Sequence, residues 1–240
     1  MDRLKTHLRL FIVLLYTYSS GHLHADQAAD MENWISNFDF RVQSFRPIQN
    51  LYYESLNVDG EVISRHSLRF RSDGLSQIYE YSGPPTLRFF QIINGEEIEF
   101  AKIDLGSSQS PTLLIFLSSE QIRSIPNNRI KKVPLSNDQT PPRHVIFVNT
   151  MPQHFKAGIR DNDSGNFVTV YPGVNRPLPL PDNRQIRLAL DVTNFGWQAV
   201  FGTTIPSSIN ETVFIILYPP MFPGGLDLRG SVIYIADRSP

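Results

Sequence analysis

The side chains that most often carry out acid–base and nucleophilic chemistry are sparse in this chain. Beyond residue 25 the histidines are His66, His144 and His154. A Ser-His-Asp hydrolase needs a base beside an activated serine and a backbone that supplies an oxyanion hole. The chain has no Gly-x-Ser-x-Gly motif, and Asp163–Asn166 has the composition of a turn between two strands. These residues do not support triad chemistry.

The same residues form no metal-binding motif. His144 and His154 lie on either side of the apolar run Val145–Val148, and the chain has no His-x-x-x-His or His-Glu-x-x-His pair. Asp161–Asn166 offers oxygen ligands at alternating positions but lacks the glycine and the final glutamate of a calcium loop. Because the chain has no cysteine, thiolate ligands and thiol catalysis are excluded. We predict no metal and no cofactor.

Carboxylates and aromatic rings are the remaining candidates. Glu96, Glu97 and Glu99 follow a turn dipeptide directly, which favours the solvated face of a hairpin strand over a glycosidase pair. Aromatic rings bind sugars by stacking, but alternation predicts that many of the rings in this chain pack in a core. The candidates for contact with a ligand or a partner are Tyr53, Tyr81 and Trp197.

Two hairpin motifs show which elements must position these side chains. Leu51–Val58 and Glu61–Phe70 flank Asp59-Gly60, and the runs 86–93 and 96–105 flank Asn94-Gly95. Such dipeptides between apolar runs predict antiparallel hairpins. The chain is 41% hydrophobic and 11% aromatic, with 18 prolines and 14 glycines, which is typical of strands and turns.

The same pattern extends over the rest of the chain. Leu113–Leu117 is continuously apolar, as expected for a strand buried on both faces, and residues 119–143 are polar and contain prolines. Alternation resumes afterwards, for example over Ile186–Val192. We count about twelve strands and predict an all-β protein, an antiparallel β-sandwich in two modules. The predicted boundaries are a module at 37–118, a polar connector at 119–142 and a second module at 143–240.

Two segments carry a resemblance to a group of proteins. Tyr81-Ser82-Gly83-Pro84, followed by Leu87–Phe90, and Val145–Asn149, followed by Tyr171-Pro172-Gly173, resemble stretches in uncharacterised secreted bacterial β-sandwich proteins. In those proteins the aromatic strand lies in a first β module and the apolar strand ending in Asn opens a second. The resemblance implies an architecture and brings no catalytic residues.

The N-terminus predicts the compartment. Arg3, Lys5 and Arg9 precede the apolar run Leu10–Leu15, and small residues follow, which is the order found in a secretory signal peptide. We assign the signal peptide to residues 1–25 and a short polar or helical lead to residues 26–36. The apolar run is too short to span a bilayer, so we expect no permanent membrane span after cleavage. The expected location is the periplasm or the cell exterior.

Composition narrows the function. A secreted eukaryotic protein of this size would more often contain disulfides, so the lack of cysteine favours a bacterial source. The net charge is −1, and removing residues 1–25 takes away three basic residues and one acidic residue, leaving −3. That charge argues against nucleic-acid binding.

We therefore expect a non-enzymatic binding or structural protein of the bacterial cell envelope, acting through protein–protein contact at sheet faces, strand edges or loops. The expected partner is an envelope protein or a polysaccharide. The alternatives are a carbohydrate-binding β-sandwich module and, third, a hydrolase whose site forms only in the fold.

Overall fold

The structure is a computed structural model. It describes ten stretches of the chain, which are 34–71, 74–106, 111–117, 129–135, 141–161, 164–182, 184–192, 195–220, 225–226 and 228–235. The predicted signal peptide at 1–25 and most of the lead at 26–36 lie outside these stretches. Trp34 has no regular structure, and Ile35 begins the first strand. No helix in the described stretches has the length and hydropathy that crossing a membrane requires.

The described part of the chain folds into seventeen β-strands, which confirms the prediction of an all-β protein. The strands of the first half are β1 (Ile35–Ser44), β2 (Leu51–Leu56), β3 (Val62–Ser67), β4 (Tyr79–Gly83), β5 (Thr86–Ile93), β6 (Glu96–Asp104), β7 (Thr112–Phe116) and β8 (Ile130–Pro134). Those of the second half are β9 (His144–Asn149), β10 (Phe155–Asp161), β11 (Ser164–Val170), β12 (Gly173–Val174), β13 (Leu178–Pro179), β14 (Gln185–Val192), β15 (Gly196–Thr204), β16 (Thr212–Tyr218) and β17 (Arg229–Ile235).

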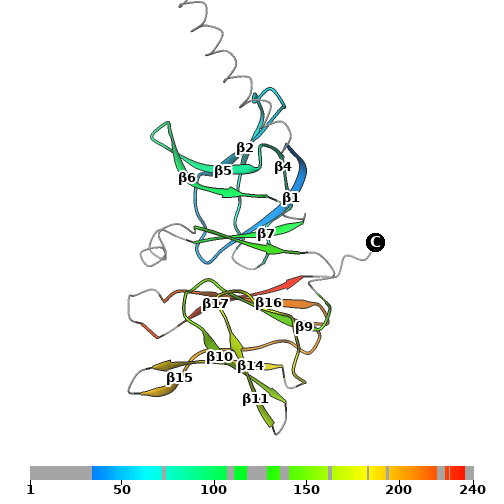
Figure 1. The fold of residues 1–240 in the computed structure, drawn as a ribbon, viewed down its shortest axis with the longest axis vertical. Helices are drawn as coiled ribbons and strands as arrows, with labels where there is room; N and C mark the ends of the chain where they lie inside the picture. Colours follow the sequence, from blue (N-terminus) through cyan, green and yellow to red (C-terminus); the bar gives the residue numbers. More distant parts are fainter. Residues whose placement is uncertain are drawn as a thin grey trace, which may run out of the picture.

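The strands form four sheets that stack along the long axis of the molecule as two sandwiches (Figure 1). In the first sandwich the outer sheet has the order β3-β2-β5-β6 and the inner sheet β4-β1-β7-β8. In the second sandwich the inner sheet is β12-β9-β16-β17, with β13 also paired to β9, and the outer sheet is β11-β10-β14-β15. The pairings are antiparallel except for β1 with β7 and β9 with β16, which are parallel.

Both predicted hairpins are present. Asn94 and Gly95 have φ of 53° and 85°, so the two-residue turn between β5 and β6 needs residues that tolerate a positive φ. Between β2 and β3, the Asn57 side-chain oxygen accepts hydrogen bonds from the backbone N–H groups of Asp59 and Glu61. Gly60, with φ of 80°, completes that loop.

The core of each sandwich forms from the alternating side chains of its two sheets. In the first sandwich the Phe40 ring of β1 lies 5.2 Å from the Tyr53 ring of β2 and 5.6 Å from the Tyr79 ring of β4. In the second sandwich Phe147 of β9 and Leu188 of β14 are fully buried in one apolar cluster. Because every second strand residue points inward, alternation alone places these residues between the sheets.

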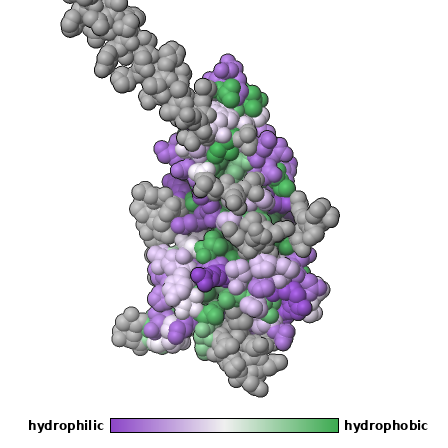
Figure 2. Space-filling view, turned by 45° about the vertical axis from the view of Figure 1, so that its right-hand side comes forward, coloured by the Kyte–Doolittle hydropathy of each residue, from purple (hydrophilic) through white to green (hydrophobic). Residues whose placement is uncertain are grey.

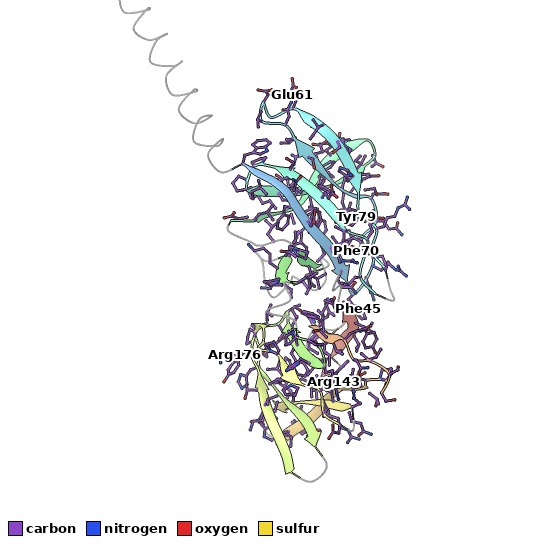
Figure 3. All side chains as sticks on the ribbon, turned by 90° about the vertical axis from the view of Figure 1, so that its right-hand side faces the viewer. Phe45, Glu61, Phe70, Tyr79, Arg143 and Arg176 are labelled. Carbon is purple, nitrogen blue, oxygen red and sulfur yellow. The ribbon has the colours of Figure 1, made fainter. Side chains whose placement is uncertain are left out.

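A third apolar cluster joins the two sandwiches. It brings Leu113 and Ile115 of β7 against Phe214, Ile216 and other residues of the second inner sheet. The two inner sheets are therefore buried on both faces, which explains why all residues of β7 and β16 are buried. At this level the ring of Phe45 lies 5.4 Å from that of Tyr218 (Figure 3).

The two sandwiches repeat one topology. Strands β1 to β3 correspond to β9 to β11, β5 to β8 correspond to β14 to β17, and β4 takes the place of the short β12 and β13. Each has one parallel pair in the inner sheet, between its first strand and its next-to-last strand. The hairpins β5–β6 and β14–β15 of the two outer sheets each contain a β-bulge at the same position. The extra residue is Phe100 in β6 and Val200 in β15.

The structure also places elements where the sequence predicted loops. β8 lies within 119–142, the segment expected to be a connector, and completes the first inner sheet. β11 begins at Ser164, so the turn predicted at Asp163–Asn166 is wrong in extent: Ser164, Gly165 and Asn166 pair with β10. The polar composition of both segments concealed strands that lie at the edge of a sheet.

Candidate functional site

Two of the three predicted contact residues are core residues, and we correct that prediction. Tyr53 is 0% exposed and Tyr81 is 3% exposed. The Tyr53 hydroxyl donates to the Glu80 carbonyl at 2.9 Å, and the Tyr81 hydroxyl donates to the Pro84 carbonyl at 2.7 Å. Burial raises the pKa of both hydroxyls above the usual value for tyrosine. Neither ring can contact a partner, because each faces the interior of the first sandwich.

Trp197, the third predicted contact residue, lies on the surface. It is 47% exposed, near the start of β15, and the Lys156 Nζ lies 4.7 Å from the centre of its ring. Phe167 of β11, 68% exposed, opposes Gly158 in the register of the same sheet. The outer sheet of the second sandwich therefore exposes two aromatic rings.

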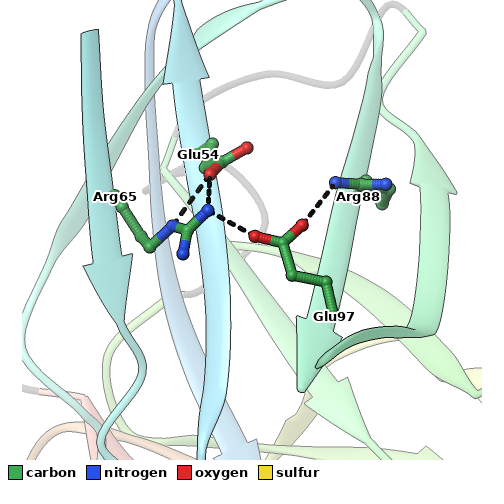
Figure 4. A network of polar contacts seen from close by, with 4 residues as sticks. All are labelled: Glu54, Arg65, Arg88 and Glu97. Atoms are coloured by element: carbon green, nitrogen blue, oxygen red, sulfur yellow. Dashed lines mark hydrogen bonds and ion pairs between the residues drawn. The ribbon is translucent and has the colours of Figure 1, made fainter. Parts of the chain in front are cut away.

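The corresponding face of the first sandwich is covered by charged side chains. Arg65 contacts both Glu54 and Glu97, and Arg88 lies 3.6 Å from Glu97 (Figure 4). Both guanidinium groups lie over the ring of Phe90, at 5.1 and 5.3 Å from its centre, and that ring is buried. The hydrogen bond to Glu54 is the main cause that raises the pKa of Arg65. The four charged groups thus satisfy one another and shield the ring.

One pair on the first outer sheet has the residue types of a hydrolase. Ser64 Oγ lies 2.7 Å from His66 Nε2, and the His66 ring stacks on Tyr53 with 4.9 Å between ring centres. We did not predict this pair from the sequence, although residues two apart on a strand share one face. In the described part of the chain no carboxylate hydrogen bonds to the His66 ring. The pair therefore lacks the third group that orients a catalytic histidine.

A groove opens at one side of the second sandwich, where the edge of the outer sheet meets the edge of the inner sheet. We call it the β11–β12 groove. Its volume is about 300 Å³. Its lining is mostly apolar and consists of Phe147, Val168, Thr169, Val170, Tyr171, Val174, Asn175, Arg176 and Leu178. In the space-filling view, hydrophobic residues lie among polar ones on the second sandwich (Figure 2).

The wall of the groove is fixed by Asn175. Its side-chain oxygen accepts a hydrogen bond from the Tyr171 N–H at 2.8 Å, and its side-chain amide donates to the Tyr171 carbonyl at 2.9 Å. Its backbone N–H donates to the Phe147 carbonyl at 2.9 Å. The side-chain amide also donates to the Phe147 carbonyl at 3.2 Å, so this one residue closes the turn after β11 and ties it to β9. Gly173, with φ of 92°, lies inside the turn.

The segment after Asn175 places a cation at the rim of the groove. β12 pairs with Val148 and Asn149, and β13 pairs with His144 and Val145. Asn175 still bonds to β9, so the residues that leave the sheet between the two short strands are Arg176 and Pro177. Arg176 lies there and is exposed, and its side chain points away from the second sandwich (Figure 3). No hydrogen bond or ion pair joins that side chain to another described residue.

The groove offers binding chemistry. Its lining contains no carboxylate and no imidazole, so the side chains that form it supply no pair for general acid–base catalysis. Among the described residues, no cluster of three or more His, Asp or Glu side chains is placed to hold a metal ion. What the groove does offer is an apolar floor, one guanidinium group and the backbone edge of β11.

Comparison with known proteins adds no assignment to this geometry: no protein-family model matches the chain, and a search of curated proteins finds no significant match.

Proposed function

We propose that this chain is an exported, non-enzymatic binding protein of the bacterial cell envelope that acts through protein–protein contact. The observation that carries the proposal is the edge of β11 beside the β11–β12 groove, with which no other described strand pairs. The order of charged, apolar and small residues in 1–25 supports export, as does the resemblance to secreted bacterial β-sandwich proteins. An exposed strand edge recruits a strand of another chain through backbone hydrogen bonds.

β11 differs from the other edge strands of the two outer sheets. The pairings of β3, β6 and β15 each contain a register shift, which bends an edge away from flat pairing. β11 pairs with β10 in unbroken register over seven residues. Its sequence, Ser-Gly-Asn-Phe-Val-Thr-Val, contains no charged residue and no proline. Of these four edges, β11 is the one without the features that prevent strand addition.

The counterpart of β11 in the first sandwich shows the contrast. β3 occupies the same position in the topology, but Ile63 is an extra residue in its pairing with β2. β3 also carries Arg65, which the ion pairs with Glu54 and Glu97 hold on its surface. The same edge of the same fold is thus protected in one sandwich and open in the other. We take the open edge as the contact surface.

The test is site-specific crosslinking in bacterial cells. A photoreactive amino acid replaces Thr169 in β11 of the tagged full-length chain and, as a control, the exposed Lys102 on the edge strand β6. We expect one envelope protein, identified by mass spectrometry, to crosslink from position 169 and not from position 102. Equal labelling from both positions, or none from 169, contradicts the proposal.

A pair of proline variants sharpens this test. Along a strand, the backbone N–H groups of successive residues point to opposite sides, so either Val168 or Thr169 directs its N–H away from β10. Proline at that position removes a donor from the free edge and leaves the β10 ladder intact. Of V168P and T169P, the variant that remains folded is the one whose proline faces the open edge. In this variant, with the photoreactive amino acid now placed at position 171, we expect the crosslink to be lost. T169V is the matched control that retains it.

A second candidate is a carbohydrate-binding module, and the exposed rings of Phe167 and Trp197 favour it. Gly158 and Ala189 lie between them in the sheet, beside Lys156 and Arg187, which pair with these two positions. Exposed rings on a sheet face could stack on sugar. If this function holds, F167A and W197A abolish retention on insoluble cell-wall polysaccharide while the proline variants retain it. The opposite pattern supports protein contact.

A further inference from the structure

We infer that the β11–β12 groove takes an extended segment of a partner protein that adds to β11, directs apolar side chains into the groove and places an acidic side chain beside Arg176. This inference rests on the proposed function and names the chemistry of the partner. It follows from three features of the same place in the fold: the backbone edge, the apolar floor and the cation at the rim.

The backbone edge determines the conformation of the partner segment. An edge strand presents unpaired N–H and C=O groups along its length, and an extended main chain satisfies them in sequence. β11 has seven residues in regular register, so the paired segment is about five to seven residues long. A helix cannot form such a ladder, because its backbone groups are already bonded within the helix.

The apolar floor of the groove requires every second side chain of the partner segment to be apolar. A strand beside β11 lies about 4.8 Å from it, and its side chains alternate between the outer face and the inner side of the sheet. On the inner side they meet the groove, where Val168 and Val170 of β11 face Phe147, Val174 and Leu178. The volume of about 300 Å³ is at the lower end of ligand pockets, which suits a few side chains.

The guanidinium group of Arg176 favours a negative charge at one end of the partner segment. Arg176 is held between Asn175, whose bonds fix the turn, and Pro177, whose ring fixes its own backbone angle. With no described carboxylate paired to it, the guanidinium group is available to an acceptor from outside. A carboxylate is the natural complement, because guanidinium and carboxylate form two parallel hydrogen bonds. If the partner segment pairs with β11 in one direction, its acidic residue follows the apolar positions. If it pairs in the other direction, the acidic residue precedes them.

A second copy of this chain is the competing occupant. Antiparallel pairing of two β11 strands centred on Phe167 would place the two exposed rings opposite each other. In that register no residue of β11 itself brings a carboxylate to Arg176, because β11 contains no acidic residue, and Asp163, the acidic position nearest to it in the sequence, lies outside the strand. We therefore favour a different protein, and the test separates the two.

The experiment measures binding of fluorescent peptides to the purified full chain by anisotropy. The probes are two capped seven-residue peptides, Thr-Val-Thr-Val-Thr-Glu-Thr and its reverse, which present the acid at either end of the apolar run. Their controls carry Gln in place of Glu or Ser in place of Val. We expect the Glu peptide of one direction to bind, its Gln form to bind about two- to fivefold more weakly, and its Ser form to show no binding.

Charge exchange identifies the contact. The R176E variant should bind the Glu peptide more weakly than the native chain does, and this loss of affinity should be at least as large as the loss caused by the Gln peptide. The variant should also bind a peptide with Lys in place of Glu more tightly than the native chain does. R187Q, a change at an exposed arginine on the outer face of the same sandwich, is the matched control and should leave binding unchanged. Restored binding in the exchanged pair would place the acidic side chain at Arg176.

Other outcomes overturn the inference in distinguishable ways. Equal binding of Glu and Gln peptides removes the role of Arg176 while the open edge stands. No peptide binding, together with a crosslinked envelope protein from Thr169, overturns the extended segment and leaves the proposed function intact. A concentration-dependent dimer in analytical ultracentrifugation that the folded proline variant abolishes identifies the occupant as a second copy.

Discussion

Phe100 and Val200 occupy equivalent places in the two sandwiches. Each is the extra residue where the second hairpin of an outer sheet changes register, and each is buried. A bulge turns two successive side chains to the same side and increases the local twist. With Phe100 and Val200 both directed inward, the same bend closes both sandwiches over their cores. The repeat thus extends to an irregularity, which shared topology alone does not require.

The first prediction concerns this bulge. Deleting Val200 forces β15 into a regular register in which the remaining residues keep their faces, because the bulge had placed Val200 and Phe201 on the same side. The deletion removes both a buried side chain and the local bend, so we expect it to destabilise the protein by more than V200A, which keeps the bulge but shortens that side chain and should cost about 1–3 kcal/mol. Urea unfolding followed by circular dichroism measures both. A deletion variant no less stable than V200A would show that the bulge is dispensable.

The second prediction concerns a close approach in the first sandwich. A Cβ on Gly83 would overlap the Tyr81 hydroxyl and lie 2.7 Å from Tyr81 Cζ. The ring cannot turn aside freely, because its hydroxyl donates to the Pro84 carbonyl and the ring is buried. We expect G83A to cost about 1–3 kcal/mol in the free energy of unfolding. G74A is the control, since nothing lies within 4 Å of a Cβ there.

The third prediction concerns the apolar contact between the two inner sheets. Ile115 of β7 and Ile216 of β16 are fully buried in it. We expect I115A and I216A each to destabilise the protein by about 2–5 kcal/mol through the cavity they leave. Because the contact is shared, we also expect a single unfolding transition in the native chain. I63A, at an exposed position, is the control, and two separate transitions in the native chain would contradict the coupling.

The sequence predicted the fold class because its local patterns agree with the final structure. Asn94-Gly95 needs no tertiary information to favour a tight turn, and the uninterrupted apolar run Leu113–Leu117 predicted burial on both faces. The repeat was harder to detect. Thr112–Leu117 and Thr212–Leu217 are the clearest similar segments, one hundred positions apart, and both are generic apolar strands.

The candidate site could not be predicted in the same way. Tyr53 and Tyr81 have the alternation of a half-exposed strand, and only the register with neighbouring strands determines that they face inward. The β11–β12 groove forms where two sheet edges meet, which no local pattern encodes. Arg176 lies in a segment with prolines at 172, 177, 179 and 181, a composition that by itself is typical of a connector. Trp197 lies on the surface, and its role as a contact residue stays a prediction.

The fourth prediction concerns stability at alkaline pH. Burial raises the pKa of Tyr53, Tyr81 and Tyr218 above the unfolded value of 10.0. A raised pKa in the folded state means that the native chain holds these protons more tightly, so this contribution is complete below pH 10 and is lost above it. We expect the free energy of unfolding to fall as pH rises from about 10 to 11. Y81F should reduce that slope, and Y171F, at an exposed ring, should leave it unchanged.

The fifth prediction concerns Asn175, which builds the wall of the groove. Its side chain bonds both the N–H and the carbonyl of Tyr171, so N175A leaves these groups without their partner. We expect N175A to cost about 1–3 kcal/mol and to speed amide hydrogen exchange in the turn at Tyr171. Q91A, which removes one exposed hydrogen bond to the Gln49 carbonyl, is the matched control. If the turn exchanges no faster in N175A than in Q91A, the side chain does not fix the groove. The wall would then depend on the pairing of β12 and β13 with β9, which N175A leaves in place.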